Sequence, residues 1–550
     1  TKRANMSIFV MMAVTLVFTG CMILYFTPII KAAVNKTYYG IEIKFICPES
    51  TDTLRAELEQ QQLPPMWPAW QEFIILITFP LTLLLLVPLT TKKMQQRGRK
   101  NAILLGLVVM NVANIFLCIL PKLSELWLYM VTNVLFQFLN GFGGALVIPA
   151  CYSIVVVAFQ NEAEPLVGLA NSSFIFGVLL GPFLGLLLNM LVKYLLTFVG
   201  FSVVFTVLGV AVMIIVPNEV NRTNINDLKT RYDSRYTFNS LELDMSQNSR
   251  NSKLSSSKVS NVIMTDIAND LNLKQKLPSY KILMKEVQTI MCFLASTVAV
   301  IMITFQQNIL VQQINQKSYP CMTPAQQLMY YLVPCLTFLA GTAIAAIATR
   351  YVRRKILIFL GLFLAGWALF LCGPSYIFGL YNNEKALDVD GNYIFRMQVS
   401  GFGLVALFDS LVIYCLLSEI LCLAHSSNEL LNDVVLIDRA AGLFTVFCAV
   451  GFILAAILGN VIVPYIRQDQ SVKSEKFPLT CDIIAIIGIA FSVLFFLTNS
   501  VFKDVISIPS KDPDPIYNRL AQEILNKMPE DEVPMFGLDY GLKQNDLVDQ

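Results

Sequence analysis

One carboxylate lies deep inside an apolar run that contains no Lys or Arg. Asp409 stands about nine residues into the apolar segment 400–424. An ionised side chain in hydrocarbon is so costly that this carboxyl group must carry a proton or bind a cation. Because these two states exclude each other, Asp409 could exchange a cation for a proton. The alternative is a carboxyl group that only hydrogen-bonds neighbouring Ser, Tyr or Asn side chains and serves packing.

Three charged residues near the ends of apolar segments have simpler interpretations. Glu419 lies ten residues after Asp409 and nearer the end of the same segment, where we expect it to meet water. Asp438 and Arg439 are adjacent at the start of the segment 440–465, and we expect them to form a local pair.

Two other apolar segments carry amide side chains that could line a polar cavity. They are Gln306, Gln307 and Asn308 in one segment and Asn133, Gln137 and Asn140 in the other. The second set has the spacing of three and four residues that places side chains on one helix face. Both sets could hydrogen-bond an amine or a hydroxyl group, or they could join helices through bonds worth about 0.6–2 kcal/mol. Tyr414 could offer its ring to a cation, or it could simply pack.

The remaining composition excludes several kinds of chemistry. The chain has one histidine, His425, which argues against a His-based metal centre or a Ser/His/Asp nucleophile. None of its 12 cysteines has zinc-finger spacing. We therefore expect no enzyme, no cofactor and no metal, and the net charge of +2 gives no reason to expect a nucleic-acid partner.

The elements that position these residues must lie in a lipid bilayer. Hydrophobic residues make up 55% of the 550 residues and charged residues 14%, and the mean hydropathy is +0.62. Soluble domains carry about 25% charged residues. A membrane-spanning helix needs about 20 apolar residues. Twelve segments qualify: 7–30, 69–90, 102–120, 126–158, 165–190, 194–216, 287–312, 324–349, 356–380, 400–424, 440–465 and 480–502. The sequence thus predicts an all-α polytopic membrane protein.

The charges between the spans predict orientation and division. Lys and Arg gather at Lys2 and Arg3, between Lys92 and Lys100, in 217–286 and between Arg350 and Lys355. This bias places both termini on the cytoplasmic (or matrix) side. The first span lacks a small-residue cleavage site, so we expect a span and not a signal peptide.

The polar segment 217–286 divides the chain. It is rich in Ser, Asn, Asp and Lys, which is typical of a flexible linker. It separates an N-terminal half of six spans, 1–216, from a C-terminal half of six spans, 287–502, and residues 503–550 form a soluble tail.

The two halves carry similar basic turns. Gly98, Arg99 and Lys100 follow the second span, and Arg353, Arg354 and Lys355 follow the eighth. Matching turns at the same place are what parallel repeats predict, although the general preference for positive loops on one side could also produce them.

This arrangement resembles the major facilitator superfamily of secondary transporters over about residues 7–502. The fifth span adds Gly177, Gly181, Pro182 and Gly185, which are similar to the G-x-x-x-G-P-x-x-G element of proton-coupled antiporters in that superfamily. Glycines at this spacing allow close helix approach, and the same residues could serve packing alone. The resemblance implies alternating access between two six-helix pseudo-repeats.

Within that superfamily the chain is most similar to the vesicular amine and polyamine transporters. The likeness rests on Phe408-Asp409-Ser410, on Phe305-Gln306-Gln307-Asn308 and on Leu371-Cys372-Gly373-Pro374-Ser375. Several family acidic positions are replaced, by Gln95, Thr349, Thr19, Thr445 and Gln307. The resemblance implies a small organic cation as cargo, exchanged for protons. It also implies a disulfide between Cys47 and Cys321 in the two loops that face each other across the halves.

Two functions fit these observations. The first is a proton-coupled transporter of an amine-like or polyamine-like cation in a vesicular, vacuolar or plasma membrane, with a possible glycan at Asn35 in a secretory-pathway lumen. The second is a transport-inactive relative that serves as a structural subunit of a larger membrane complex, with the mitochondrial inner membrane as the alternative location. The replaced acidic residues favour the second.

Overall fold

The computed structural model describes residues 2–25, 69–118, 120, 123, 125–159, 163–218, 280–314, 324–373, 375, 377–378, 392–427, 433–459 and 476–499. Within these ranges the helices are α1 (Lys2–Leu24), α4 (Ala69–Arg97), α5 (Arg99–Leu117), α6 (Leu126–Ala158), α7 (Ala163–Ile215), α10 (Tyr280–Leu283), α11 (Val287–Ile314), α12 (Pro324–Ala348), α13 (Arg354–Cys372), α14 (Asn392–Ser427), α15 (Asp433–Ile457) and α17 (Lys476–Thr498).

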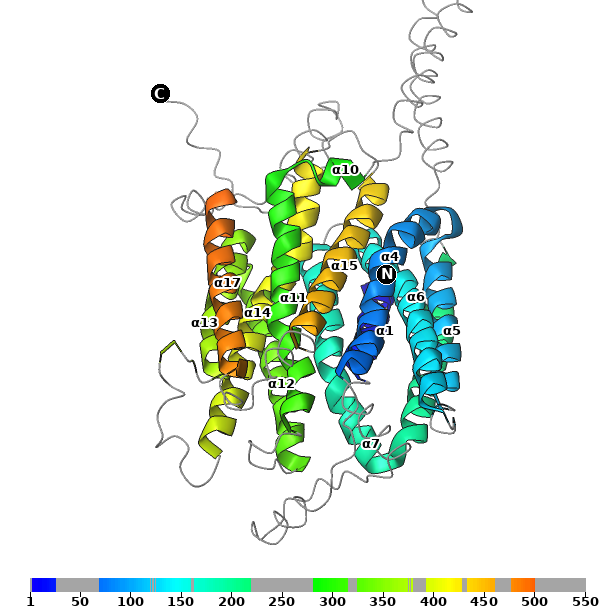
Figure 1. Cartoon of the computed structure of the whole chain (residues 1–550). Coiled ribbons are helices and arrows are strands. Elements are labelled where there is room, and N and C mark those ends of the chain that lie inside the picture. Colours follow the sequence, from blue (N-terminus) through cyan, green and yellow to red (C-terminus); the bar gives the residue numbers. More distant parts are fainter. Residues whose placement is uncertain are drawn as a thin grey trace, which may run out of the picture. The chain divides into compact units, whose positions relative to one another are not determined.

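The described helices contain 12 segments that are long and apolar enough to cross a membrane. Only helices can satisfy every backbone group inside one segment, so apolar runs of this length fold as helices in lipid. The number of spans predicted from hydropathy is confirmed. The 33-residue fourth span matches its expected bounds at both ends. The element α7 carries two spans, Pro165–Leu188 and Thr197–Ile215, and turns back between them (Figure 1).

One predicted span ends earlier than expected. We predicted a span over 356–380, and α13 ends at Cys372 with Gly373 as its C-cap residue. Pro374 follows directly in the sequence. A proline disfavours helical geometry in the residue before it, which explains the early end.

We name two ends and two groups of helices. Because consecutive spans run in opposite directions, the starts of α5 and α13 lie at one end of the bundle, called here the basic end, and the other is the far end. The helices before residue 219 form the N-terminal group, and those after residue 279 form the C-terminal group. All described helices lie in one compact unit, Thr1–Val501.

Close helix approach in the N-terminal group depends on two predicted glycines. A Cβ atom added to Gly177 would lie 2.0 Å from the backbone oxygen of Val17, and one added to Gly181 would lie 2.6 Å from that of Cys21. Both distances are far inside van der Waals contact. These glycines therefore let α7 lie directly against α1. Pro182 and Gly185 follow them within α7.

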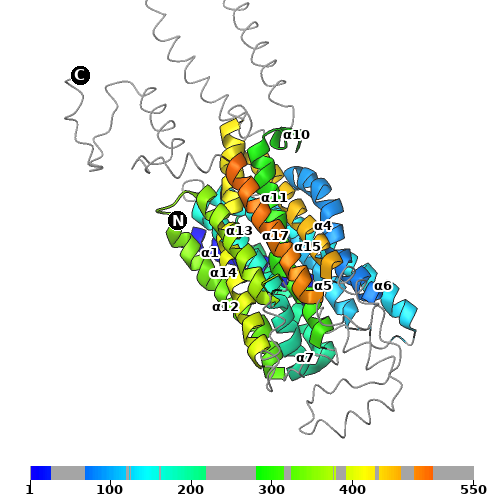
Figure 2. The same cartoon turned by 60° about the vertical axis from the view of Figure 1, so that its left-hand side comes forward.

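The two groups pack against each other through a few helix pairs. α4 and α6 of the N-terminal group contact α15, while α7 contacts α12 and α14. In the C-terminal group α14 lies beside both α12 and α13, as the turned view also shows (Figure 2). α14 therefore belongs to the core of its own group and to the contact between groups.

Several predictions fall on residues outside those that the structure describes. They are Cys47 and Cys321, the sequon at Asn35, most of the linker 217–286 and the tail 503–550. They remain predictions.

Candidate functional site

Asp409 is fully enclosed by protein. Its side chain is 0% exposed, and neither carboxyl oxygen has a hydrogen-bond partner among the described residues. Its neighbours in α14 are fixed on two sides. Ser410 lies against Gly341 of α12, and the backbone of Phe408 lies against Gly361 of α13. The alternative of a carboxyl group held by Ser, Tyr or Asn neighbours is thus not observed in the described part of the chain.

The face of α14 that carries Asp409 has a second unpartnered polar group. Gln398, Phe402 and Asp409 follow the helical spacing that places them on one face. Gln398 is buried, and its Nε2 has no partner among the described residues. The ring of Tyr330 from α12 packs on Phe402 at a centroid distance of 4.6 Å. This face of α14 therefore points into protein and not toward lipid.

The predicted amides of α6 also point inward. Asn133, Gln137 and Asn140 are all buried. Asn114 of α5 donates from Nδ2 to Asn140 Oδ1 at 3.5 Å, and the Tyr25 hydroxyl donates to Asn114 Oδ1 at 3.5 Å. Neither amide atom of Asn133 has a partner among the described residues. The sequence pattern thus identified a buried polar face, although it missed Asn114.

Two other predicted groups are less informative. Gln306, Gln307 and Asn308 lie on α11, and their side chains are outside what the structure describes. The Tyr414 hydroxyl donates to the backbone oxygen of Pro165 at 3.3 Å. Tyr414 therefore lies in the contact between α14 and α7, where its ring packs on the other group.

The first basic turn joins the two groups. Gly98 has φ 91°, a conformation that favours glycine, and it reverses the chain between α4 and α5. Arg99 then makes two parallel hydrogen bonds of 3.0 Å to the carboxylate of Asp438 in α15, and both side chains are buried. Lys100 donates to the backbone oxygens of Met213 and Val216 at the end of α7. The expected local pair of Asp438 with Arg439 was wrong, because Asp438 faces α5.

The described ion pairs of the second basic turn lie within one group. Arg353 is the N-cap residue of α13. Arg354 Nε and Lys355 Nζ lie 3.7 and 3.8 Å from the carboxylate of Glu419 in α14, and Lys355 also donates to Gln288. Glu419 is buried, so the expectation that it meets water was wrong. The two basic turns are alike in sequence. The first pairs with an acidic residue of the other group, and the second pairs with an acidic residue of its own group.

Tyr280 adds a second link at the basic end. It begins α10, directly after the part of the linker that lies outside the described residues. Its hydroxyl shares a hydrogen bond of 2.6 Å with Thr91 of α4 and donates to the oxygen of Pro88. Its ring lies 4.7 Å below the guanidinium of Arg439. A single side chain thus contacts α4 of one group and α15 of the other.

A third link lies nearer the middle of the bundle. Asn171 of α7 accepts a hydrogen bond from the Tyr152 hydroxyl of α6 and donates to the backbone oxygen of Ile413 in α14. The ring of Tyr152 also contacts Phe444 of α15. Sequence reasoning missed Asn171, although an amide within an apolar span was the available signal.

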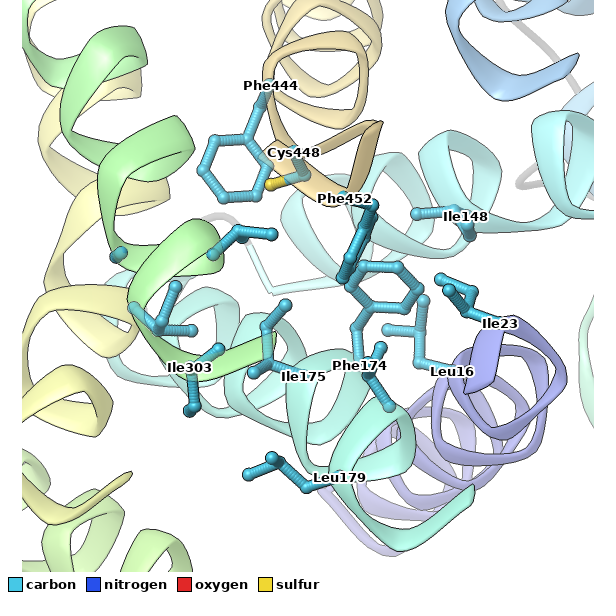
Figure 3. Close-up of a cluster of buried hydrophobic side chains, with 14 of the residues drawn as sticks. Leu16, Ile23, Ile148, Phe174, Ile175, Leu179, Ile303, Phe444, Cys448 and Phe452 are labelled. Carbon is cyan, nitrogen blue, oxygen red and sulfur yellow. The ribbon is translucent and has the colours of Figure 1, made fainter. Parts of the chain in front are cut away.

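An apolar cluster lies near this link, where the two groups meet (Figure 3). The rings of Phe174 and Phe452 meet edge to face, with their centroids 6.4 Å apart. Figure 3 shows them among Leu16, Ile148 and other apolar side chains from both groups. The contacts between the two groups therefore extend from the Arg99–Asp438 ion pair at the basic end to this apolar cluster.

The comparison with known families decides the class of protein. The model of the Major Facilitator Superfamily matches residues 52–418, which is more than half of the chain. The chain belongs to the major facilitator superfamily. No curated protein matches it.

Membership of the major facilitator superfamily indicates what the fold and the contacts between the two groups do. The protein is an integral multi-pass membrane protein and a secondary transporter, in a family that is not enzymatic. Such transporters expose a site near the bilayer midplane by rocking one bundle against the other. The contacts at the basic end therefore belong to a state in which that end is closed.

Proposed function

We propose that this major facilitator transporter exchanges a small organic cation for protons, with Asp409 as the group that carries either one. The observation that carries the proposal is a carboxyl group that is fully buried and has no protein partner for either oxygen among the described residues. An unpaired buried charge is strongly unfavourable, so Asp409 holds a proton in the state described here. A cation that enters the site replaces that proton.

Three further features support this class of cargo. The buried amides Asn133 and Gln398 could receive polar groups of an amine, since both have unpartnered atoms. The Gly-Pro element of α7 resembles that of proton-coupled antiporters. The Asp409-Ser410 pair is similar to a pair in the vesicular amine transporters.

A second candidate function is favoured by the apolar cluster. Phe174, Phe452 and Leu16 fill the space where the two groups meet (Figure 3). A small polar cation gains nothing from such a lining. A transport-inactive structural subunit of a larger membrane complex would have no need of a polar path, so this candidate is kept beside the first.

Uptake by reconstituted protein distinguishes the two. Proteoliposomes would be given a panel of labelled amines and polyamines under an imposed pH gradient, with Asp409→Asn as the test variant. Asp482→Asn is the matched control, because Asp482 is also a buried aspartate in a span and already accepts a hydrogen bond from the Ile377 N–H. We expect gradient-driven uptake by the wild type and by Asp482→Asn, and none by Asp409→Asn. If no amine enters with any protein, and the chain purifies from native membrane in a stoichiometric complex, the structural function is correct.

The compartment and the orientation are part of the proposal. We infer that the basic end faces the cytoplasm and that the opposite side is an oxidising lumen, which would allow Cys47 and Cys321 to form a disulfide. A non-reducing peptide map should contain the linked pair. Two free thiols would indicate a reducing compartment such as the mitochondrion. Proteolysis of sealed cytoplasmic-side-out vesicles should cut within 217–286 before 31–68, and the reverse order would invert the orientation.

A further inference from the structure

The amide of Asn171 connects three helices that belong to both groups. Asn171 is 0% exposed. Its Oδ1 accepts from the Tyr152 hydroxyl at 3.2 Å, and its Nδ2 donates to the backbone oxygen of Ile413. Both ends of the amide are therefore used. When the N-terminal and C-terminal groups separate at the basic end, the bond to Ile413 must break, because α7 and α14 belong to different groups.

The acceptor of this bond lies one helical turn from the proposed coupling group. Ile413 follows Asp409 by four residues in α14. In a regular α-helix the N–H of residue 413 bonds the carbonyl of residue 409, so the two residues belong to the same turn. Because Asn171 binds a backbone atom, it detects the position of that turn and is insensitive to the identity of the side chain at 413.

We propose that Asn171 is a positioning residue that couples closure of the basic end to the α14 turn carrying Asp409. The Asn171 amide holds the turn in place while the end is closed. A change in occupancy at Asp409 that shifts the turn weakens the bond and favours opening. This inference rests on the proposed role of Asp409.

The chain offers a second, less buried asparagine bridge as a control for a purely structural role. Asn111 of α5 is also an amide with both ends bonded. It donates to the Thr206 hydroxyl at 2.7 Å and accepts from the Ser202 hydroxyl. Both of those partners lie in α7, so this bridge stays within the N-terminal group. If an asparagine bridge only holds helices together, removing either one should have the same consequences.

Two native thiols flank the Asn171 bridge and can report opening without any cargo. Cys151 precedes Tyr152 on α6, and Cys448 follows Phe444 by one turn on α15. Both are free and buried, and Tyr152 and Phe444 are in ring contact. Cys481, also free and buried, lies at the far end within the C-terminal group and serves as the internal control for general loosening.

The experiment measures the rate at which a membrane-permeant maleimide labels each thiol, by mass spectrometry of the full-length protein in proteoliposomes. Asn171→Leu keeps the side-chain volume and removes both bonds. We expect labelling of Cys151 and Cys448 to rise about 3- to 10-fold, the factor that corresponds to losing a buried hydrogen bond, with Cys481 unchanged. Asn111→Leu should leave all three rates near the wild-type values. Equal rates in the wild type and Asn171→Leu, or the same rise with Asn111→Leu, would overturn the proposal.

The coupling to Asp409 is tested by a double variant. Asp409→Asn should change the labelling rate of Cys448 in the wild-type background, and this change should shrink toward none in the Asn171→Leu background, because contacting elements are not additive. The same factor in both backgrounds, or no effect in either, would overturn the coupling. Since labelling needs no cargo, a failure here is separate from a failure of amine uptake, which would contradict the proposed function instead.

Discussion

The two basic turns use similar sequences for different purposes. Arg99 reaches across to the other group and meets Asp438 in a buried, two-bonded ion pair. Arg354, at the corresponding place in the second half of the chain, lies 3.7 Å from the carboxylate of Glu419 in its own group. A basic turn after the second helix of a repeat therefore does not by itself indicate a contact between groups. Whether such a turn contacts the other group depends on which acidic residue the fold places beside it.

We expect the two turns to differ most in stability when the acidic partner of each is removed. Asp438→Asn removes the carboxylate that pairs with the buried Arg99 side chain, and breaking a buried pair in this way costs about 3–5 kcal/mol. Glu419→Gln should cost less, because its two described partners lie farther away, at 3.7 and 3.8 Å, and keep part of their surface exposed. Thermal melting in detergent and maleimide labelling of Cys448 measure both effects. Similar effects of the two substitutions would contradict the distinction between the turns.

An Arg-to-Lys exchange at each turn should produce a smaller difference between the two turns. Lysine keeps the charge and cannot make two parallel bonds to one carboxylate. We therefore expect R99K to accelerate Cys448 labelling clearly, by an amount that corresponds to about 1–2 kcal/mol. R354K should change the labelling rate little. If R99K behaves as the wild type, the two-bonded geometry is unimportant for closure.

We expect the smallest effect for Tyr280. Its side chain adds contacts between the groups beside the first basic turn. Tyr280→Phe removes the bonds to Thr91 and Pro88 and keeps the ring beneath Arg439. Losing a hydrogen bond of this kind costs about 0.5–1.5 kcal/mol. Labelling of Cys448 should rise modestly with Tyr280→Phe and further with Tyr280→Ala, which also removes the cation–π contact. The opposite order of the two variants would exclude a role for the ring.

Hydropathy and spacing predicted the local features of the fold. The 12 spans follow from the length of the apolar runs alone. Gly177 and Gly181 stand where α7 lies against α1, as their spacing indicated. Asn133, Gln137 and Asn140 share a buried face because helical periodicity fixes which residues lie on the same side. Each of these predictions needed only a short stretch of sequence.

The partners of the charged residues could not be predicted in this way. Arg99 and Asp438 are 339 residues apart. Asp438 has Arg439 beside it in the sequence, so a local pair was the simplest expectation. Adjacent residues on a helix do not face each other, which made that pair unfavourable. Glu419 is buried because α13 brings Arg354 and Lys355 against α14, and only the packing of the helices reveals this.

One property of Asp409 could be predicted from the sequence, and another could not. The sequence identified it as a carboxyl group within an apolar span, and its complete burial is in agreement. The absence of a partner for either oxygen, which holds for the described residues, depends on the positions of several helices and could not be read from the sequence.

Proton movement out of the vesicle during amine uptake is the measurement closest to the proposed role of Asp409. A pH-sensitive dye trapped inside proteoliposomes would record the internal pH when a transported amine is added outside, for the wild type, Asp409→Asn and Asp482→Asn. If Asp409 carries a proton in exchange for the cation, the wild type and Asp482→Asn should release protons in proportion to amine uptake, and Asp409→Asn should release none. Proton release by Asp409→Asn at the wild-type rate would contradict the account.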